Sequence, residues 1–161
     1  MARTSKRKVR LESQSLQENV SVKTYMAGIY ARLSVDNHDG KEISIETQIE
    51  MAKEYLKSHT EITLYDCYSD LGATGTNFQR SDFERLMQDV RDGLINCIIV
   101  KDFSRFGRNY IETGNFVEKI FPFLGVRFIA ITDQYDSIKQ ADCNEALSMH
   151  LKNIANELYA R

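Results

Sequence analysis

Serine, threonine and arginine side chains gather in three polar segments, each following a short apolar run. The segments contain Arg32 and Ser34; Thr74, Gly75 and Arg80; and Ser104, Arg105 and Arg108. The planar guanidinium group of arginine matches pairs of phosphate oxygens, and its charge is not lost by titration. Cations near a serine favour its alkoxide form and stabilise the negative charge that develops on a phosphoryl group under attack. The four arginines have no obvious acidic partners, so the set indicates an anion site in which a serine attacks phosphorus.

A simpler interpretation of the same residues stays open at this point. Arginines are common on protein surfaces, and a serine at the end of a strand is more often a cap or turn residue than a nucleophile. The two interpretations differ in whether the three polar segments meet in the folded chain. That depends on the elements that position them.

Apolar runs predict buried strands at residues 26–31, 62–68, 97–100 and 126–131. Helical spacing and capping residues predict helices at 44–58, 81–93, 109–122 and 142–161. Alternating strands and helices indicate an α/β fold with a mostly parallel central sheet flanked by helices. The carboxyl ends of parallel strands lie at one edge of the sheet, where such folds bind ligands. We therefore expect the three polar segments to share that edge.

Two helix starts and one helix end have specific signals. Ser81-Asp-Phe-Glu84 has the spacing of a capping box, and Asn109 can cap the helix that follows it. The apolar face expected for that second helix consists of Ile111, Phe116, Val117, Ile120 and Leu124. Pro122 removes a backbone hydrogen bond, so the last turn should be kinked or end there.

Four motifs occur in the order typical of one enzyme family. They are Tyr30-Ala-Arg-Leu-Ser34, Ser44-x-x-x-Gln48, Gly75 followed by Arg80, and Ser104-Arg-Phe-Gly-Arg108. Together they resemble the signature of the resolvase/invertase serine recombinases, from about Tyr25 to the end of the chain. The segments 101–109 and 121–125 resemble most closely the large transposon-encoded members of TnpX or TndX type.

The resemblance implies a role for each matching position. Ser34 matches the nucleophile, which takes the 5′ phosphate of DNA and releases a 3′ hydroxyl group. Gln48, four residues after Ser44, matches a position against the active site, although a surface glutamine is an equally good interpretation. The arginines that match those around the scissile phosphate are Arg32, Arg80, Arg105 and Arg108. Such enzymes use no metal, ATP or other cofactor.

Two positions depart from the small resolvases. Thr74 replaces a frequent serine and keeps a hydroxyl group, whereas Ser104 replaces an acidic residue. Asp102 would lie on the same side of the chain as residue 104 if the backbone stays extended after Val100. It is then a candidate for the missing carboxyl group, as a proton carrier or as an orienter of Arg105. Alternatively, Asp102 caps the loop and Ser104 forms a local hydrogen bond.

The composition limits the environment and the partners of the chain. The formal net charge of −2 lacks the basic footprint of a self-sufficient DNA-binding module, so other regions are expected to supply most of the affinity for DNA. Cys67, Cys97 and Cys143 are odd in number and unpaired in spacing, which favours free thiols in a reducing compartment. The three histidines show no zinc-site spacing, and no apolar run indicates a membrane span or signal peptide. A cytoplasmic protein is expected.

The expected organisation has three parts. Residues 1–24 read as a flexible polar tail, 25–140 as the catalytic domain, and 141–161 as the truncated start of a long helix. Leucine and isoleucine recur along that helix at Leu147, Leu151, Ile154 and Leu158. This stripe suits packing on the domain or on a partner helix. The resemblance favours the partner helix, and implies a homodimer that becomes a tetramer in the synaptic complex with DNA.

Two other classes of function remain as alternatives. A non-covalent phosphate-binding α/β domain would predict a glycine-rich phosphate loop, and neither the Gly-x-Gly-x-x-Gly nor the Walker pattern is present. A regulatory, catalytically inactive recombinase-like module would dimerise without cutting DNA. The presence of Ser34 together with all four arginines argues against that degeneration.

Overall fold

The structure, a computed structural model, describes residues 23–33, 43–71, 80–107 and 109–139. Three of the predicted site residues, Ser34, Thr74 and Arg108, lie outside these ranges. The predicted tail at residues 1–24 lies almost entirely outside them, and the predicted helix at 142–161 with its leucine stripe lies wholly outside.

The described residues form a five-stranded sheet with the strand order β2-β1-β3-β4-β5. Its strands are β1 (Tyr25–Arg32), β2 (Ile62–Asp70), β3 (Cys97–Val100), β4 (Arg127–Ala130) and β5 (Tyr135–Asp136). The pairs β1–β2, β1–β3 and β3–β4 are parallel, and β4–β5 is antiparallel. The expected α/β fold with a mostly parallel sheet is confirmed. The two-residue strand β5 was not predicted because it is too short to show a periodic pattern.

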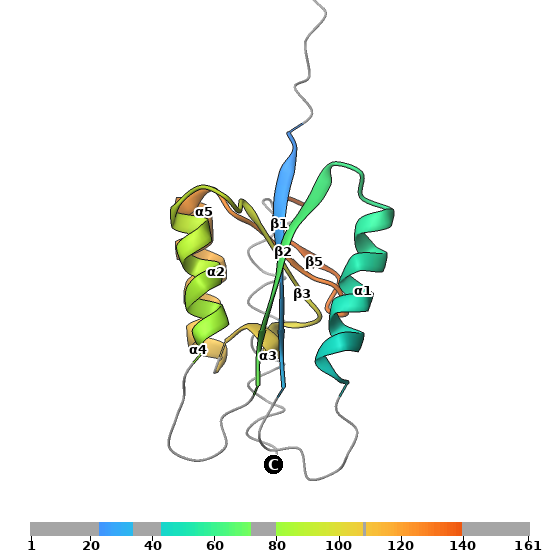
Figure 1. The fold of residues 1–161 in the computed structure, drawn as a ribbon. Helices are drawn as coiled ribbons and strands as arrows, with labels where there is room; N and C mark the ends of the chain where they lie inside the picture. The colour runs from blue at the N-terminus through green and yellow to red at the C-terminus, as the bar shows by residue number, and fades with distance from the viewer. Residues whose placement is uncertain (1–22, 34–42, 72–79, 108, 140–161) are drawn as a thin grey trace, which may run out of the picture.

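Helices cover both faces of the sheet (Figure 1). The helix α1 (Ile45–Lys57) lies on one face, and α2 (Ser81–Arg91), α4 (Tyr110–Asn115) and α5 (Phe121–Leu124) lie on the other. The short helix α3 (Phe103–Phe106) follows β3 at the end of the sheet where β1 and β2 also finish. Helix α3 was not predicted, because that segment was interpreted as a loop.

The hydrophobic core has two parts, one on each side of the sheet. Ala27 and Ile29 of β1 pack with Ala52 of α1, whereas Tyr30 of β1 packs with Leu86 of α2. All four residues of β3 are buried, which confirms that this strand is covered on both faces. Alternation along β1 therefore directs Tyr30 towards α2 at the carboxyl end of the sheet.

The helical segment before Pro122 is wider than an α-helix. A π-helical turn, η1 (Phe116–Ile120), separates α4 from α5, and the N–H group of Phe121 bonds to the carbonyl of Phe116. The helix ends at Leu124, and Gly125 has a left-handed φ of 69°. The helix does not end at Pro122 as expected: the proline lies in the first turn of α5, directly after the π turn, and the helix continues to Leu124. The predicted apolar face is wrong at two positions: Ile111 is 67% exposed and Leu124 is 40% exposed. The π turn adds a residue, so a face drawn at α-helical spacing does not stay on one side.

The N-terminus of α2 is not capped as predicted. Ser81 is the first helical residue, Arg80 occupies the N-cap position, and no side chain of the cap residue bonds to the helix. Instead, the carboxylate of Asp70, at the end of β2, accepts hydrogen bonds from the N–H groups of Asp82 (3.1 Å) and Phe83 (3.0 Å). The predicted capping box is therefore wrong, because a carboxylate distant in sequence reaches the helix first. The predicted cap of α4 is confirmed, with Asn109 accepting from the N–H group of Glu112 at 2.8 Å.

The two described cysteines are free, Cys97 buried and Cys67 partly buried. Burial raises the pKa of the Cys97 thiol to about 12, so it stays protonated and unreactive. Among the described residues, no helix is both long and apolar enough to cross a membrane.

Candidate active site

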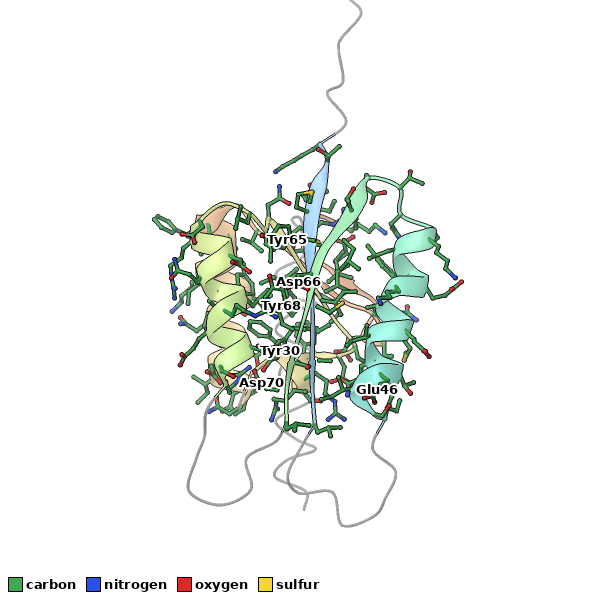
Figure 2. The ribbon with its side chains drawn as sticks, in the orientation of Figure 1. Tyr30, Glu46, Tyr65, Asp66, Tyr68 and Asp70 are labelled. Carbon is green, nitrogen blue, oxygen red and sulfur yellow. The ribbon has the colours of Figure 1, made fainter. Side chains whose placement is uncertain are left out.

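The carboxyl ends of β1, β2 and β3 lie at one edge of the sheet, as expected from the parallel pairing. Arg32, the last residue of β1, is directly opposite Asp70, the last residue of β2. The backbone continues this contact, because the N–H group of Leu33 bonds to the carbonyl of Asp70 at 3.3 Å. Tyr30 and Asp70 lie side by side near this edge, on the side covered by α2 (Figure 2).

Gln48 holds the backbone of Arg32 at both of its peptide groups. Its side-chain oxygen accepts from the N–H group of Arg32 at 3.3 Å, and its side-chain nitrogen donates to the carbonyl of Arg32 at 3.2 Å. The same nitrogen donates to the carbonyl of Ile43 at 2.9 Å. Gln48 is 1% exposed and is therefore not a surface glutamine. It fixes the chain two residues before Ser34.

Ser44 positions Gln48 through the start of α1. Ser44 is the N-cap residue, and its hydroxyl group accepts from the N–H group of Thr47 at 3.2 Å. Gln48 then closes the first turn, with its N–H group bonded to the carbonyl of Ser44 at 3.0 Å. In the motif Ser44-x-x-x-Gln48, Ser44 therefore caps α1. Gln48, one turn later, is buried and holds the backbone of Arg32.

Arg32 and Arg105 meet between β1 and α3. The Nη2 atom of Arg32 donates to the carbonyls of Ser104 (2.8 Å) and Gly107 (3.2 Å). The Nη1 atom of Arg105 donates to the carbonyl of Arg32 at 3.3 Å. Each guanidinium group thus contacts the backbone at or beside the other residue, and both bring positive, multidentate N–H donors to the carboxyl edge.

Gly107 is required by this close packing. A Cβ atom at residue 107 would lie 2.0 Å from the Oγ1 atom of Thr113 and 3.0 Å from the carbonyl oxygen of Asn109. The backbone at Gly107 therefore lies against the first turn of α4, and this contact leaves room only for glycine.

Asp102 lies in a compact polar cluster beside Arg105. Its carboxylate accepts from the hydroxyl group of Ser104 at 2.5 Å and from the Nζ atom of Lys101 at 2.7 Å, and it is 3.9 Å from the Nε atom of Arg105. Burial by itself would raise the pKa of Asp102. Hydrogen bonds from Lys101 and Ser104, with the charges of Lys101 and Arg105, outweigh that effect and hold the pKa below its ordinary value.

The extended backbone expected after Val100, which would place residues 102 and 104 on the same side of the chain, is not observed. The chain does not stay extended after Val100, because α3 starts at Phe103. The two side chains nevertheless meet, since the hydroxyl group of Ser104 reaches back to the residue before the helix. The N-terminus of α3 is capped from elsewhere: the N–H group of Phe103 donates to the carboxylate of Asp133 at 2.8 Å. The carboxylate of Asp102 therefore bonds to Lys101 and Ser104 rather than to the helix.

Arg80 is buried and lies across the ends of several elements. Its Nε and Nη2 atoms donate to the hydroxyl group of Tyr30 at 3.2 and 3.1 Å, and Nη2 also donates to the carbonyl of Phe106. The hydroxyl group of Tyr30 donates in turn to Asp70 at 2.9 Å. Burial raises the pKa of Tyr30 well above its ordinary value despite the nearby charge of Arg80, so the hydroxyl group keeps its proton for Asp70.

Two arginines have acidic partners that the sequence did not suggest. The Nη1 atom of Arg80 is 3.7 Å from a carboxylate oxygen of Glu112, and Arg105 has Asp102 at 3.9 Å. The expectation that the arginines lack acidic partners is therefore wrong for these two. Both partners come from elements that follow β3, and only folding brings Glu112 to Arg80 across 32 positions of sequence.

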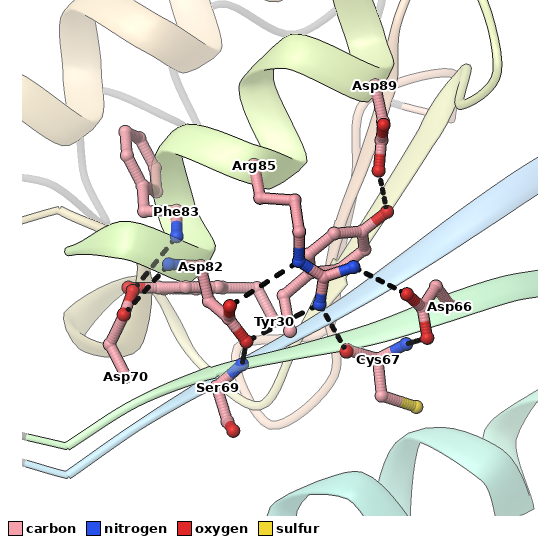
Figure 3. Close-up of polar contacts among 10 residues, drawn as sticks. Tyr30, Asp66, Cys67, Ser69, Asp70, Asp82, Phe83, Arg85 and Asp89 are labelled. Carbon is pink, nitrogen blue, oxygen red and sulfur yellow. Dashed lines mark hydrogen bonds and ion pairs between the residues drawn. The ribbon is translucent and has the colours of Figure 1, made fainter.

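Side chains of α2 also bond along the open side of β2, beside the candidate site (Figure 3). Asp82 accepts from the N–H group of Ser69 at 2.9 Å, and Arg85 donates to the carbonyl of Cys67 at 3.2 Å. Arg85 also pairs with Asp66 at 2.6 Å. These contacts fix α2 on the end of β2 and so fix the position of Arg80, which immediately precedes the helix.

Sequence reasoning missed four residues of this neighbourhood: Tyr30, Asp70, Glu112 and Asp133. Tyr30 was visible as the first residue of the motif that contains Ser34. Asp70 and Asp133 each follow an apolar strand at the edge already identified, which was the available signal for them. The only sequence signal for Glu112 was its position three residues after the predicted cap Asn109.

The described part of the site offers hydrogen-bond donors and positive charge. Arg32, Arg80 and Arg105 all lie at the edge where β1, β2 and β3 end, and this arrangement suits a phosphate diester. Among the described residues, no group of three or more His, Cys, Asp or Glu side chains is placed to hold a metal ion.

Comparisons with known proteins bear on the family and the fold of the chain. The model of the family described as "Resolvase, N terminal domain" matches residues 27–161. The chain is similar to the crystal structure of a resolvase family site-specific recombinase from Streptococcus pneumoniae, with 26% sequence identity, a TM-score of 0.63, and coverage of 85% of this chain and 91% of that one. It also has the fold of the N-terminal catalytic domain of TP901-1 integrase, with 23% identity, a TM-score of 0.61, and coverage of 84% and 96%. No curated protein matches the chain.

Proposed function

The chain belongs to the resolvase family, and we propose that it cuts and rejoins DNA through a covalent bond to Ser34. It has the fold of a serine recombinase catalytic domain. The covalent intermediate, the roles of individual residues and the biological setting are parts of this proposal.

The observation that carries the proposal is the pair of contacts between Arg32 and Arg105 at the carboxyl edge of the sheet. Each side chain donates to a backbone carbonyl at or beside the other residue. Arg32 is two residues before Ser34, and both of its peptide groups are held by Gln48. Arg105 bonds to the carbonyl of Arg32 at 3.3 Å, so a second cation is fixed beside the same segment. A phosphate near Ser34 would meet two positive, multidentate donors on rigid elements.

The proposed step balances without an external energy source. The Oγ atom of Ser34 loses its proton and attacks phosphorus, while the bond between phosphorus and the 3′ oxygen breaks. The 3′ oxygen leaves with a proton as a hydroxyl group, and the 5′ phosphate stays on Ser34 as a phosphodiester. Attack by a 3′ hydroxyl group on this phosphoserine rejoins DNA and releases Ser34. One phosphodiester replaces another, so neither ATP nor a metal is required.

The substrate, on this proposal, is a pair of recombination sites in DNA, and the motif resemblance supports a transposon excision and insertion enzyme of TnpX or TndX type. A net charge of −2 supports weak DNA binding by this chain alone. A homodimer that forms a synaptic tetramer would use the stripe at Leu147, Leu151, Ile154 and Leu158. Sedimentation of a Leu151→Glu, Ile154→Glu double variant tests this, with a folded monomer expected.

Trapping the covalent adduct tests the proposal directly. The intact protein is incubated with a suicide substrate whose cut cannot be rejoined, and the denaturant-resistant adduct is mapped by peptide mass spectrometry. The adduct is expected on Ser34 and is expected to disappear in Ser34→Ala, with folding and DNA binding nearly unchanged. Ser44→Ala and Ser104→Ala are the controls that retain Ser34. An adduct on either of those serines, or no adduct at all on a DNA that the protein binds, would contradict the proposal.

A further inference from the structure

Helix α3 carries Arg105 but is too short to hold its own position. It has four residues, and a single helical turn is not stable through its own hydrogen bonds. Arginine side chains hold carbonyl groups of this helix: Arg32 donates to the carbonyl of Ser104 at 2.8 Å, and Arg80 donates to that of Phe106. The N–H group of the first helical residue points in the opposite direction, so it needs an acceptor from another part of the fold.

The turn between β4 and β5 supplies that acceptor and holds the chain that leads into α3. The carboxylate of Asp133 accepts from the N–H group of Phe103, the first residue of α3, at 2.8 Å. The preceding residue, Thr132, donates twice to the carbonyl of Lys101, from its N–H group at 2.8 Å and from its hydroxyl group at 2.9 Å. The turn therefore fixes the backbone at residue 101 and again at residue 103.

The same turn contains a backbone conformation that residues with a Cβ atom rarely adopt. Gln134 has a left-handed φ of 52°, and its N–H group closes the turn on the carbonyl of Ile131 at 3.1 Å. The next residue, Tyr135, is buried in β5, and the centre of its ring lies 5.1 Å from that of Phe103. This reversal of the chain thus brings Asp133 to the N–H group of Phe103 and Tyr135 to its ring.

We propose that Asp133 is a positioning residue for the cleavage reaction: it fixes the start of α3 and, through that helix, the guanidinium group of Arg105. The inference rests on the proposed function, because it assumes that Arg105 contacts the scissile phosphate. The backbone N–H group of Arg105 bonds to the carbonyl of Asp102 at 3.1 Å, so Phe103 and Arg105 lie in one closed turn and move together. The contact of Arg105 with the carbonyl of Arg32, at 3.3 Å, depends on that placement.

The proposed role requires an oxygen acceptor at residue 133 and not a negative charge. The amide oxygen of asparagine accepts from a backbone N–H group as a carboxylate does, and the two residues are equally effective at the start of a helix. Alanine removes the acceptor. Asp133→Asn should therefore keep Arg105 in place, and Asp133→Ala should release it. A role that depends on the charge of Asp133 would instead make the two variants alike.

Nuclear magnetic resonance of the ¹⁵N-labelled protein tests the positioning without requiring catalysis. In Asp133→Ala, we expect the backbone N–H group of Phe103 to exchange with solvent roughly tenfold faster and the Nε–H signal of Arg105 to shift. In Asp133→Asn, both should stay close to the wild type. Asp92→Ala, on an exposed residue at the end of α2, is the control and should change neither. An unmoved Arg105 signal in Asp133→Ala would overturn the proposal.

Adduct formation on a suicide substrate gives the second measurement. At saturating DNA, Asp133→Ala should be about tenfold slower than the wild type, and Asp133→Asn should stay within about threefold. The DNA concentration that gives half the maximal rate should change by less than about twofold in both, because Asp133 acts through Arg105. Val90→Ala, which truncates a buried side chain of α2, is the control for lost stability and should cut like the wild type while folded.

Two results of the rate measurement would overturn the proposal: a wild-type rate in Asp133→Ala, or equal slowing in Asp133→Ala and Asp133→Asn. If the wild type forms no adduct, the covalent function fails, and the resonance measurement alone decides the role of Asp133. If Asp133→Ala does not fold, Asp133→Glu replaces it in both measurements, because glutamate keeps the charge but displaces the acceptor oxygen. Asp133→Glu should then be slower than Asp133→Asn, and the reverse order would overturn the proposal.

Discussion

Arg32 and Arg105 each bind the backbone next to the other. Arg32 donates to the carbonyl of Ser104, the residue before Arg105, at 2.8 Å, and Arg105 donates to the carbonyl of Arg32 at 3.3 Å. The end of β1 and the helix α3 are thereby locked together by two charged side chains. Both side chains are positive and carry several N–H donors, which is the chemistry that the proposed phosphate contact requires.

Arg105→Lys should slow adduct formation roughly tenfold or more while the protein stays folded. Lysine keeps the charge but has a single nitrogen, so it cannot bind the carbonyl of Arg32 and a phosphate with the geometry of a planar fork. Arg91→Lys, on the exposed end of α2, is the control and should cut like the wild type. Single-turnover rates at saturating DNA measure the effect. Equal rates for both variants would show that Arg105 acts only as a point charge.

Gln48→Ala should lower the free energy of unfolding by about 1–3 kcal/mol, because it leaves partly buried peptide groups of Arg32 and Ile43 without the side chain of Gln48 as partner. Gln88→Ala, on the exposed face of α2, should change it by less than about 0.5 kcal/mol. Urea denaturation followed by circular dichroism measures both. Cleavage should also fall in Gln48→Ala under conditions where the variant is folded. Normal cleavage would mean that the hydrogen bonds of Gln48 stabilise the fold and do not contribute to cleavage.

Asp70→Ala should destabilise the domain by about 2–3 kcal/mol, and Ser81→Ala should have little effect. The carboxylate of Asp70 caps α2 and accepts from the buried hydroxyl group of Tyr30, so its removal leaves three donors unsatisfied. Ser81 is exposed and already inside the helix. Thermal and urea unfolding measure the loss of stability in both variants. A larger loss in Ser81→Ala than in Asp70→Ala would show that Ser81, and not Asp70, caps α2.

Asp102→Asn should slow cleavage by less than about a hundredfold and should leave the shape of the pH–rate profile unchanged near neutral pH. The lowered pKa favours the ionised form of Asp102, so we expect its carboxylate to orient Arg105 and Lys101 rather than to carry the proton to the leaving oxygen. Ser104→Ala should have a smaller effect, because Asp102 keeps Lys101 and Arg105. A loss above a hundredfold with a shifted pH profile would identify Asp102 as the general acid.

The contribution of Asp102 to stability should be lost only at low pH. A carboxyl group with a lowered pKa stabilises the fold above the unfolded-state pKa, and this contribution is lost as the pH falls through the lower folded-state value. The difference in unfolding free energy between wild type and Asp102→Asn should therefore be constant from pH 8 to about 5 and shrink only below about pH 4. A decline that begins near neutral pH would contradict the direction of the pKa shift.

The sequence alone predicted the four parallel strands, the sheet edge where the candidate site lies, and the family. These follow from local signals: uninterrupted apolar runs such as 97–100, helical spacing after Ser44, and motifs whose residues are close in the chain. The cap at Asn109 was also predicted from a local signal, because the residue acts on its own helix turn.

Only the tertiary structure decided which side chains hold the site in place. Asp70 replaces the local cap of α2, Asp133 caps α3 from a loop 30 positions away, and Glu112 reaches Arg80 across the same edge. The sequence left open whether Gln48 is a surface residue. The packing of α1 on β1 directs its side chain to the backbone of Arg32. A buried donor takes whichever acceptor lies nearest in space, and sequence separation does not enter that choice.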